Sequence, residues 1–391
     1  MTESSPYIGR EQTLVKHFIL QKYLERFAHI VGSAFEVITY VDCFSGPWNV
    51  QSEELRDSSF SIAIEELRKA QKTLLERGKA TKLRCFFMEK DRDAFAKLRE
   101  FASQVSDVDV AVKNCELENS VSDIVQFVKS GGRKSFPFVF IDPTGWTGFG
   151  MNSITPLLSL KPCEVLINFM TGHIRRFIDS PNEQTKESFE SLFGSGDYRE
   201  RIVGLAGQDR EDEVVRLYIQ NVKRTGNFEF ACSAIVLHPE IDRTHFHLIY
   251  VTRNAKGVEV FKEVEKKAMT LMEQSRADAQ QRTRIKRSGA RELFPSEYSH
   301  DPTHYEGLRD RYVEQARSRI QTMLESKSHL LYDDAWITAL GYPLVWESDL
   351  KDWIATWEKS GKIRIEGKEE KQRVPKREKN NFIVWIVKSE S

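Results

Sequence analysis

The sequence has few cysteines, no long apolar run and no excess of charge of either sign. Its five cysteines are scattered and contain no Cys-x-x-Cys pair, so we expect neither a disulfide framework nor a cysteine metal site. No stretch approaches the ~20 apolar residues that cross a bilayer, and the first residues lack the basic and apolar regions of a signal peptide. We therefore expect a cytoplasmic protein that does not enter a membrane.

The charge balance limits how the chain could bind a polyanion. Lysine and arginine together number 58 among 391 residues, and so do aspartate and glutamate. This excludes an overall field that attracts nucleic acid or an anionic membrane, so any such site must be a local patch. The length of the chain favours two domains rather than one.

Short apolar runs alternate with helical patterns through the first half of the chain. Continuous apolar strands separated by helices indicate a parallel sheet that is covered on both faces. A helix is expected before them, at 11–31, and two adjacent strands after them, at 228–237 and 245–253. This α/β pattern resembles the Rossmann-like fold of class I methyltransferases with a helical insertion near 170–227. The apolar runs are 37–44, 83–89, 108–113, 136–142 and 165–169.

The composition changes after residue 272. Polar residues dominate 273–304, and five cations cluster there, which indicates a basic linker: Arg282, Arg284, Lys286, Arg287 and Arg291. Three helical patterns and two short strands then predict a winged-helix domain. The expected organisation is an N-terminal helix at 1–34 that packs on the Rossmann-like domain, that domain at 35–272, the linker at 273–304 and the winged helix at 305–391.

Three of the expected strands end in residues that suit a methyl donor. Asp42 ends the first strand, and Phe44 and Gly46 follow it; a glycine lets backbone amides approach a ligand closely. Glu89 ends the second strand, where Rossmann domains bind ribose hydroxyls, and its long spacing from Asp42 disfavours a dinucleotide. Asn114 ends the third strand, at a place suited to an adenine edge. The alternatives are that Asp42 belongs to an ordinary tight turn, that Glu89 caps a helix, and that Asn114 is a simple loop residue.

The fourth strand leads into Asp142, Pro143, Gly145 and Trp146. A carboxylate and a proline-linked carbonyl can hydrogen-bond an exocyclic amine, and a nearby aromatic ring can stack on a base that has left its helix. The alternative is a turn that ends the strand, with Trp146 in the core. We favour the interpretation in which these residues bind the substrate, because all four motifs fall at the carboxyl ends of strands, where α/β sheets bind ligands.

Six runs of this sequence resemble the three-Cys-motif partner (TcmP) family: VKHFILQKYLERF, YVDCFSGPW, FFMEKD, FVFIDPTGW, VLINFMTGHIRRF and HFHLIYVTRNAKG. The resemblance covers roughly residues 12–265. It implies a methyltransferase-like protein with a genetically linked partner that bears a three-cysteine motif. Trp48 stands where the family usually has glycine. The residues that the resemblance marks are Asp42, Phe44, Gly46, Glu89, Asp142, Pro143, Gly145, Trp146, Asn168, Phe169, Arg175 and Arg176.

Two groups of cations are candidates for binding phosphate. Arg175 and Arg176 follow the fifth strand, at the expected rim of the pocket, unless they belong to a solvated helix face. The loop between the last two strands is the second candidate, or else an ordinary charged loop, and its cations include Lys371, Arg373, Lys376 and Arg377. We expect no metal, because His245 and His247 share one side of a strand but lack a third ligand.

These features predict an S-adenosylmethionine-dependent methyltransferase that modifies a nucleic-acid base, with an exocyclic amine favoured. Its expected catalytic residues are Asp142, Pro143 and Trp146. The expected donor-binding residues are Asp42, Phe44, Gly46, Glu89 and Asn114, and the expected substrate-binding residues are Arg175, Arg176, Lys371, Arg373, Lys376 and Arg377. One alternative is a non-catalytic adaptor that keeps the fold and binds the three-cysteine-motif protein, and another is a methyltransferase that acts on that partner.

Overall fold

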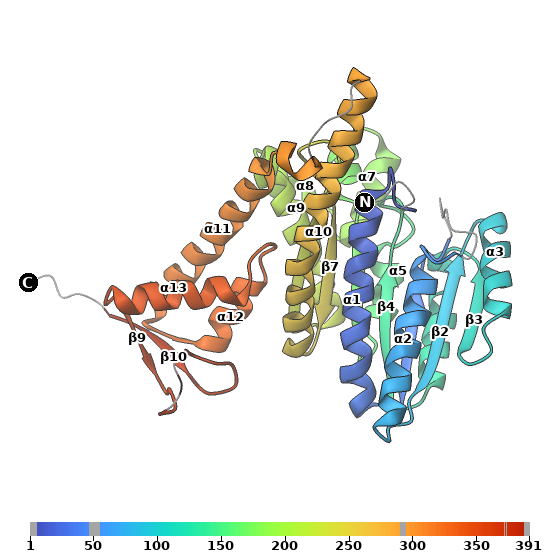
Figure 1. The fold of residues 1–391 in the computed structure, drawn as a ribbon, viewed down its shortest axis with the longest axis horizontal. Helices are drawn as coiled ribbons and strands as arrows, with labels where there is room; N and C mark the ends of the chain where they lie inside the picture. The colour runs from blue at the N-terminus through green and yellow to red at the C-terminus, as the bar shows by residue number, and fades with distance from the viewer. Residues whose placement is uncertain (1–5, 47–54, 290–294, 371, 373, 387–391) are drawn as a thin grey trace, which may run out of the picture. The chain divides into compact units, whose positions relative to one another are not determined.

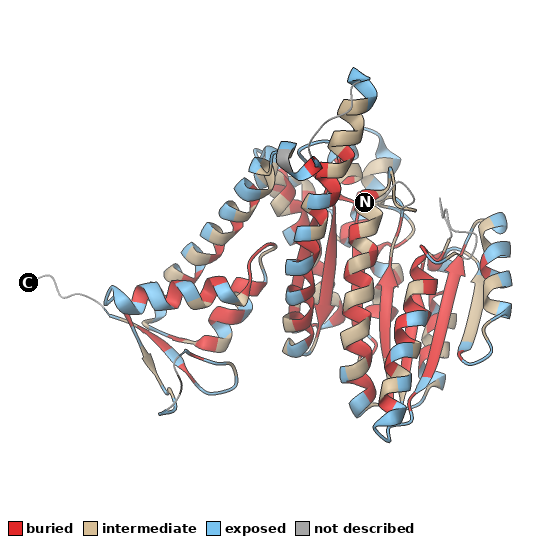
Figure 2. Ribbon diagram, viewed as in Figure 1, coloured by how far each residue is buried: buried red, intermediate tan, exposed pale blue. Residues whose placement is uncertain are grey.

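The computed structural model describes residues 6–46, 55–289, 295–370, 372 and 374–386. The chain divides into two compact units, the first made of residues 1–231 and 235–300 and the second of residues 232–234 and 301–391. Both units have buried apolar side chains in their interior (Figure 2). None of the described helices has the length and apolarity that a membrane span requires.

A mixed sheet of seven strands, mostly parallel, forms the centre of the first unit (Figure 1). Its strand order is β3-β2-β1-β4-β5-β7-β6, and β7 runs antiparallel to β5. Both features are consistent with the expected Rossmann-like methyltransferase fold. The strands are β1 (Val37–Asp42), β2 (Lys82–Glu89), β3 (Asp109–Asn114), β4 (Ser135–Ile141), β5 (Glu164–Phe169), β6 (Phe230–Leu237) and β7 (Thr244–Thr252).

Alternate residues of the central strands bury opposite faces of the sheet. Tyr40 of β1 and Phe138 of β4 are paired in register, and they stack beneath the first helix, where Tyr23 joins them. Val41 and Val139, one position further along each strand, belong to the core on the other face. Successive side chains of a strand point to opposite faces of the sheet, and helices cover both faces. The strands therefore appear in the sequence as continuous apolar runs.

Helices α1 (Glu11–Ala34), α2 (Ser59–Glu76) and α10 (Ala255–Ser288) lie side by side in front of the sheet in Figure 1. On the other face, α4 (Val121–Ser130) packs on α5 (Met151–Leu158), and α5 packs on α9 (Gly207–Gly226). The short η1 (Leu117–Asn119) precedes α4, and α3 (Arg92–Ser103) connects β2 to β3.

The expected helical insertion consists of several separate helices. α6 (Thr171–Phe177), α7 (Glu183–Phe193) and α8 (Tyr198–Ile202) precede α9. Gly194, Gly204 and Gly207 have positive φ angles at the ends of these helices, a conformation that glycine adopts without strain. The helical insertion expected near 170–227 is therefore divided at these glycines.

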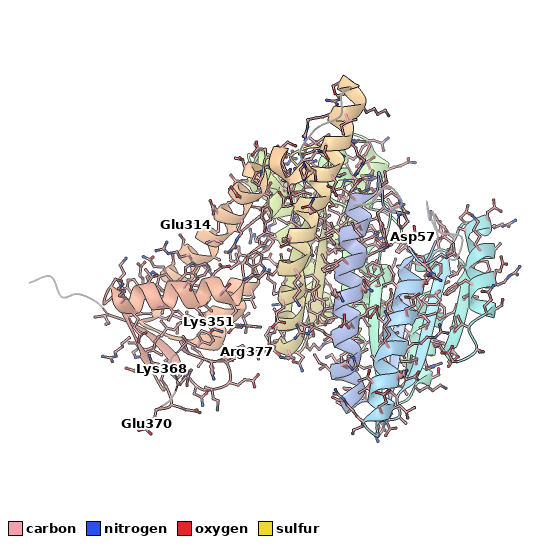
Figure 3. The ribbon with its side chains drawn as sticks, in the orientation of Figure 1. Asp57, Glu314, Lys351, Lys368, Glu370 and Arg377 are labelled. Atoms are coloured by element: carbon pink, nitrogen blue, oxygen red, sulfur yellow. The ribbon has the colours of Figure 1, made fainter. Side chains whose placement is uncertain are left out.

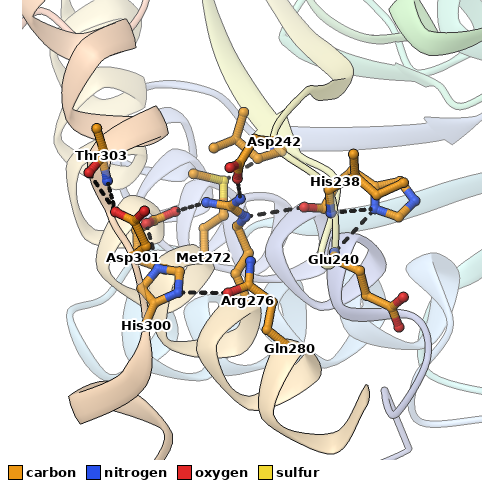
Figure 4. A network of polar contacts seen from close by, with 12 residues as sticks. His238, Glu240, Asp242, Met272, Arg276, Gln280, His300, Asp301 and Thr303 are labelled. Atoms are coloured by element: carbon orange, nitrogen blue, oxygen red, sulfur yellow. Dashed lines mark hydrogen bonds and ion pairs between the residues drawn. The ribbon is translucent and has the colours of Figure 1, made fainter. Parts of the chain in front are cut away.

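The expected linker at 273–304 is wrong for its first half, because residues 273–288 continue helix α10. Arg276 is 1% exposed, and its guanidinium bonds the carbonyl of His238 at 3.1 Å and the carboxylates of Asp242 and Glu273 (Figure 4). This polar segment thus contacts the β6–β7 turn through the charge pairing of Arg276, and Ala277 and Ala279 of the same segment are also buried. The short η2 (Ser296–Ser299) follows, and His300 bonds Glu273 at 2.9 Å.

In the described part of the second unit there are three helices and a three-stranded antiparallel sheet with the order β8-β10-β9. Its helices pack around buried Trp336, Trp353 and Trp357. The sequence pattern predicts all of these elements except the short β8. In chain order they are α11 (Thr303–Lys327), β8 (His329–Leu331), α12 (Tyr332–Leu340), α13 (Glu347–Lys359), β9 (Ile363–Glu366) and β10 (Phe382–Trp385).

Candidate functional site

A cavity of about 320 Å³ lies at the carboxyl ends of β1, β4 and β5. The first turns of α1 and α2 and residues of β7 complete its wall. In Figure 3, Asp57 is labelled beside the N-terminal end of α1. The lining residues are Gly9, Arg10, Gln12, Thr13, Lys16, His17, Phe44, Gly46, Asp57, Ser58, Ser59, Asp142, Pro143, Thr144, Asn168, Met170, His245 and Phe246.

Asp42 is fully buried and holds the turn that leads into the cavity. Its carboxylate accepts hydrogen bonds from the backbone N–H of Phe44 at 3.1 Å and from Ser59 Oγ at 2.6 Å. Burial raises the pKa of Asp42 to about 6, and these hydrogen bonds oppose the shift. Phe44 and Gly46 line the cavity, whereas Asp42 does not, so its contacts support the turn. Trp48 lies outside the described residues.

Asp142 is bonded to two other side chains at the end of β4. Lys16 Nζ of α1 lies 2.5 Å from its Oδ2, and Asn168 Nδ2 of β5 donates to its Oδ1 at 2.7 Å. The side-chain oxygen of Asn168 is buried and has no hydrogen-bond partner among the described residues. Pro143 is also buried and lines the cavity. The structure thus brings Asp142, Pro143 and Asn168 together, as expected for the ends of adjacent strands.

Glu89 and Asn114 occupy the carboxyl ends of β2 and β3 and are paired in register. Glu89 is 4% exposed and accepts a hydrogen bond from the backbone N–H of Asp91 at 2.7 Å. Asp91 caps α3 by accepting from two backbone amides, so the cap belongs to Asp91. The amide of Asn114 donates to the Glu89 carbonyl at 2.8 Å, which ties β3 to β2. Neither Glu89 nor Asn114 is among the residues that line the cavity.

Trp146 packs against the helical insertion. Its ring stacks on Phe189 with 5.4 Å between centroids and lies 4.9 Å from the Phe177 ring. Its indole N–H donates to Ser188 Oγ at 2.9 Å. These contacts match the alternative in which Trp146 is part of the core, and Trp146 does not line the cavity.

Arg175 and Arg176 are exposed residues of α6. Arg175 pairs with the buried carboxylate of Glu211 at 2.9 Å, and the Arg176 guanidinium lies 5.9 Å from the Phe177 ring. Neither side chain lines the cavity. The pairing of Arg175 with Glu211 is a contact between helices, which reduces its availability to an external phosphate.

The two strand histidines have different surroundings. His247 is buried and bonds Thr171 Oγ1 at 2.7 Å, whereas His245 lines the cavity. Burial lowers the pKa of His245 to about 4 and that of His17, the other histidine that lines the cavity, to about 3. Both are therefore uncharged near neutral pH. Within the described part of the chain, no three His, Cys, Asp or Glu side chains are grouped so that they could hold a metal ion.

The basic loop between β9 and β10 is largely paired internally. Lys368 bonds Glu358 at 3.1 Å and Lys379 bonds Glu369 at 2.9 Å. The Arg377 guanidinium lies 4.4 Å from the Trp336 ring and bonds Glu378 at 2.6 Å. Figure 3 labels Lys368 and Arg377 in this unit. Lys376 is exposed, while Lys371 and Arg373 lie outside the described residues.

Several cavity residues were not predicted from the sequence. Arg10, Gln12, Lys16 and His17 come from the start of α1, and Ser59 comes from the start of α2. Arg10 pairs with buried Asp57 at 2.5 Å. The available signal for Lys16 and His17 is their presence in the run VKHFILQKYLERF, since nothing in helical periodicity places them at a strand edge.

Comparisons with known proteins give no family assignment. No family model matches the chain. No curated protein matches it either. One similar solved structure is a Legionella pneumophila protein of the family DUF519, at 9% identity and a TM-score of 0.37, with 65% of this chain and 91% of that chain covered. Another is a loganic acid methyltransferase with SAH, at 10% identity and a TM-score of 0.30, with 74% and 94% covered. What the cavity can do is therefore inferred from its own residues.

Proposed function

We propose that this protein is an S-adenosylmethionine-dependent methyltransferase. The supporting observation is one cavity at the carboxyl ends of β1, β4 and β5 that combines the Phe44–Gly46 turn with Asp142, Pro143 and Asn168. Ligands of open α/β sheets bind at this edge. The volume of about 320 Å³ lies at the lower end of the range for small-molecule sites.

The residues present fit a methyl donor at the β1 end of the cavity. Asn168, whose buried oxygen lacks a partner among the described residues, lies in the same cavity at the end of β5 and is left to the acceptor. The Phe44–Gly46 turn would hold the amino-acid part of the donor. Glu89, which ends the neighbouring strand β2 outside the cavity lining, is the residue proposed to bind its ribose. The bound donor would supply a methyl group on a positively charged sulfur.

The chain's own residues would orient the acceptor and exclude water. Asp42 fixes the turn through Phe44 and Ser59, and Asp142 holds the Asn168 amide. His17 and His245 stay uncharged near neutral pH, so they limit the charge of the cavity wall. Rigid hydrogen-bonded positions of this kind contribute to rate by holding reactants in place.

Calorimetric titration with S-adenosylmethionine and S-adenosylhomocysteine tests this proposal. We expect saturable 1:1 binding of both, and weaker binding by the variant Gly46→Val, because a branched side chain blocks close backbone approach. Gly307→Val, at a position outside the cavity lining with open space around an added Cβ, is the matched control. Absence of binding by the folded wild-type protein would favour the adaptor function.

We further propose that the second unit is a winged helix and that the acceptor is a nucleic-acid base. The order α11-β8-α12-α13-β9-β10 and the basic loop support this proposal. Since most described cations of that loop pair with acids of the same unit, the exposed Lys376 is the residue on which polymer contact would chiefly depend. Transfer of labelled methyl groups to RNA, DNA or protein identifies the acceptor.

A further inference from the structure

A buried acceptor atom beside Asp142 has no hydrogen-bond partner among the described residues. Asn168 is 2% exposed, and its Oδ1 has no hydrogen bond within the described residues. The orientation of this amide follows from chemistry: its Nδ2 faces Asp142 Oδ1 at 2.7 Å, and an ionised carboxylate can only accept. Buried polar atoms in native proteins nearly always have partners, so Asn168 Oδ1 requires one.

Asp142, in contrast, has both of its oxygens engaged. Lys16 Nζ lies 2.5 Å from Oδ2 with 13% of its side chain exposed, and Asn168 binds Oδ1. The ammonium group neutralises the carboxylate, so the pair carries no net charge. Asp142 therefore acts mainly on Asn168, by keeping its amide in one orientation.

The other charged groups of the cavity wall are also balanced. Arg10 pairs with Asp57 at 2.5 Å, and His17 and His245 are uncharged near neutral pH. Beside the Lys16–Asp142–Asn168 cluster, an alkylammonium acceptor would lose its hydration without gaining an unpaired carboxylate, which is unfavourable. An uncharged N–H group needs only an acceptor atom, and Asn168 Oδ1 provides one.

We propose that Asn168 Oδ1 accepts the N–H of the methyl acceptor, that Asp142 is the positioning residue for Asn168, and that Lys16 makes the site select an uncharged N–H group over an alkylammonium. The chemical class is an exocyclic amine of a heterocyclic base rather than a lysine side chain. This inference rests on the proposed function, because it names the acceptor class of the same cavity. It also replaces the expectation that Asp142 itself holds the amine.

Three probes test the inference on the full-length protein, with and without saturating S-adenosylhomocysteine. Cytidine carries an N–H amine, N4,N4-dimethylcytidine lacks it, and benzylamine is an alkylammonium. Dissociation constants are measured by saturation-transfer NMR titration. We expect the wild-type protein to prefer cytidine to its dimethyl analogue by about tenfold, the usual scale for one hydrogen bond to a buried group. Benzylamine should bind at least tenfold more weakly than cytidine.

Two variants separate the roles of the side chains. Asn168→Leu, which conserves volume, should lose the preference for cytidine while its affinity for S-adenosylhomocysteine stays within twofold of wild type. Lys16→Met leaves Asp142 without its cation, so benzylamine binding should rise about tenfold or more. Because the Lys16→Met result does not depend on the Asn168 variant, it also tests the charge argument if Asn168→Leu fails to fold.

The outcomes distinguish this inference from the proposed function. Equal binding of the two nucleosides, no nucleoside binding, or a cytidine preference that survives in Asn168→Leu overturns the assignment of Asn168. Unchanged benzylamine affinity in Lys16→Met overturns the role of Lys16. If S-adenosylhomocysteine still binds in these cases, the methyltransferase proposal stands; if it does not bind the wild-type protein, that proposal fails separately.

Discussion

Asp42 is a buried carboxylate whose described hydrogen bonds come from neutral groups. The backbone N–H of Phe44 and the hydroxyl of Ser59 donate to it, and Tyr40 Oη lies 3.5 Å away. Burial raises its pKa to about 6, so the folded protein keeps this proton between about pH 4 and pH 6, where the unfolded chain loses it. Asp42 thus lowers stability as the pH rises through that window.

We expect Asp42→Asn to gain stability relative to wild type by roughly 2–3 kcal/mol between pH 4 and pH 8, because a shift of one pKa unit corresponds to about 1.4 kcal/mol. The amide keeps an oxygen for Phe44 and removes the buried charge. Urea unfolding at several pH values measures the difference. Asp93→Asn, at an exposed position, serves as the control and should show no such trend. A pH-independent difference for Asp42→Asn would contradict the assignment.

Candidate site residues that end strands are predictable from the sequence, whereas those that come from helices are not. Asp142 and Asn168 could be placed together because adjacent parallel strands end at the same edge of a sheet. Lys16 bonds Asp142 across 126 positions, and no local pattern encodes a pairing of that range. Trp146 is predicted to be a site residue from its place in a motif, but it does not line the cavity. The motif does not reveal that Phe177 and Phe189 pack on its ring.

At the scale of elements, continuous apolar runs made the strands of the first unit predictable. For the second half of α10, composition predicts a linker, whereas the structure has a helix. Composition cannot distinguish a solvated linker from a polar helix with one buried arginine. Residues such as Ala277, Ala279 and Gln280 favour a helix but also occur in linkers. The tertiary contacts of Arg276 with Asp242 and Glu273 decide between them.

Arg276→Met should destabilise the first unit by about 1–3 kcal/mol, because the His238 carbonyl loses its donor and Glu273 keeps only His300, whereas the exposed Asp242 is solvated by water. Lys286→Ala, on an exposed position of the same helix, should change stability by less than about 0.5 kcal/mol. Thermal unfolding followed by circular dichroism measures both. Equal small effects would indicate that this part of α10 does not pack.

Gly257 allows the start of α10 to approach the sheet closely. A Cβ atom at this position would lie 2.1 Å from Tyr250 Oη and 2.9 Å from Glu164 Oε1. Tyr23 Oη also bonds Glu164, at 2.6 Å, so the clash would disturb a buried hydrogen-bond network.

We expect Gly257→Ala to cost about 1–3 kcal/mol of stability, the range for overpacking. Gly307→Ala in α11 has open space around the added Cβ and should be neutral or stabilising by up to ~1 kcal/mol. Guanidinium unfolding compares the two variants. A loss for Gly307→Ala that matched the loss for Gly257→Ala would exclude the steric explanation.

At the scale of the whole molecule, the balance of 58 cations and 58 anions means that polymer binding must depend on a few exposed cations. Lys376→Ala should reduce the slope of log affinity against log salt by about 0.7–0.9, the contribution of one phosphate contact, without changing stability. Arg377→Ala should instead lower the stability of the second unit, because Arg377 covers Trp336. Anisotropy titrations at several salt concentrations, paired with unfolding curves, separate the two effects. Salt-insensitive binding would count against polymer contact at this loop.

The packing of α1 on late parts of the chain has a consequence for synthesis. Tyr23 bonds Tyr250, which follows it by 227 positions, and its ring also packs on Phe261 of α10. At a translation rate of about 5–20 residues per second, the first helix waits roughly 10–50 s for these partners to leave the ribosome. During that interval the aromatic face of α1 lacks part of its cover. The α1 segment of the nascent chain is therefore exposed to aggregation during this time, and chaperone binding there would protect the protein until α10 is made.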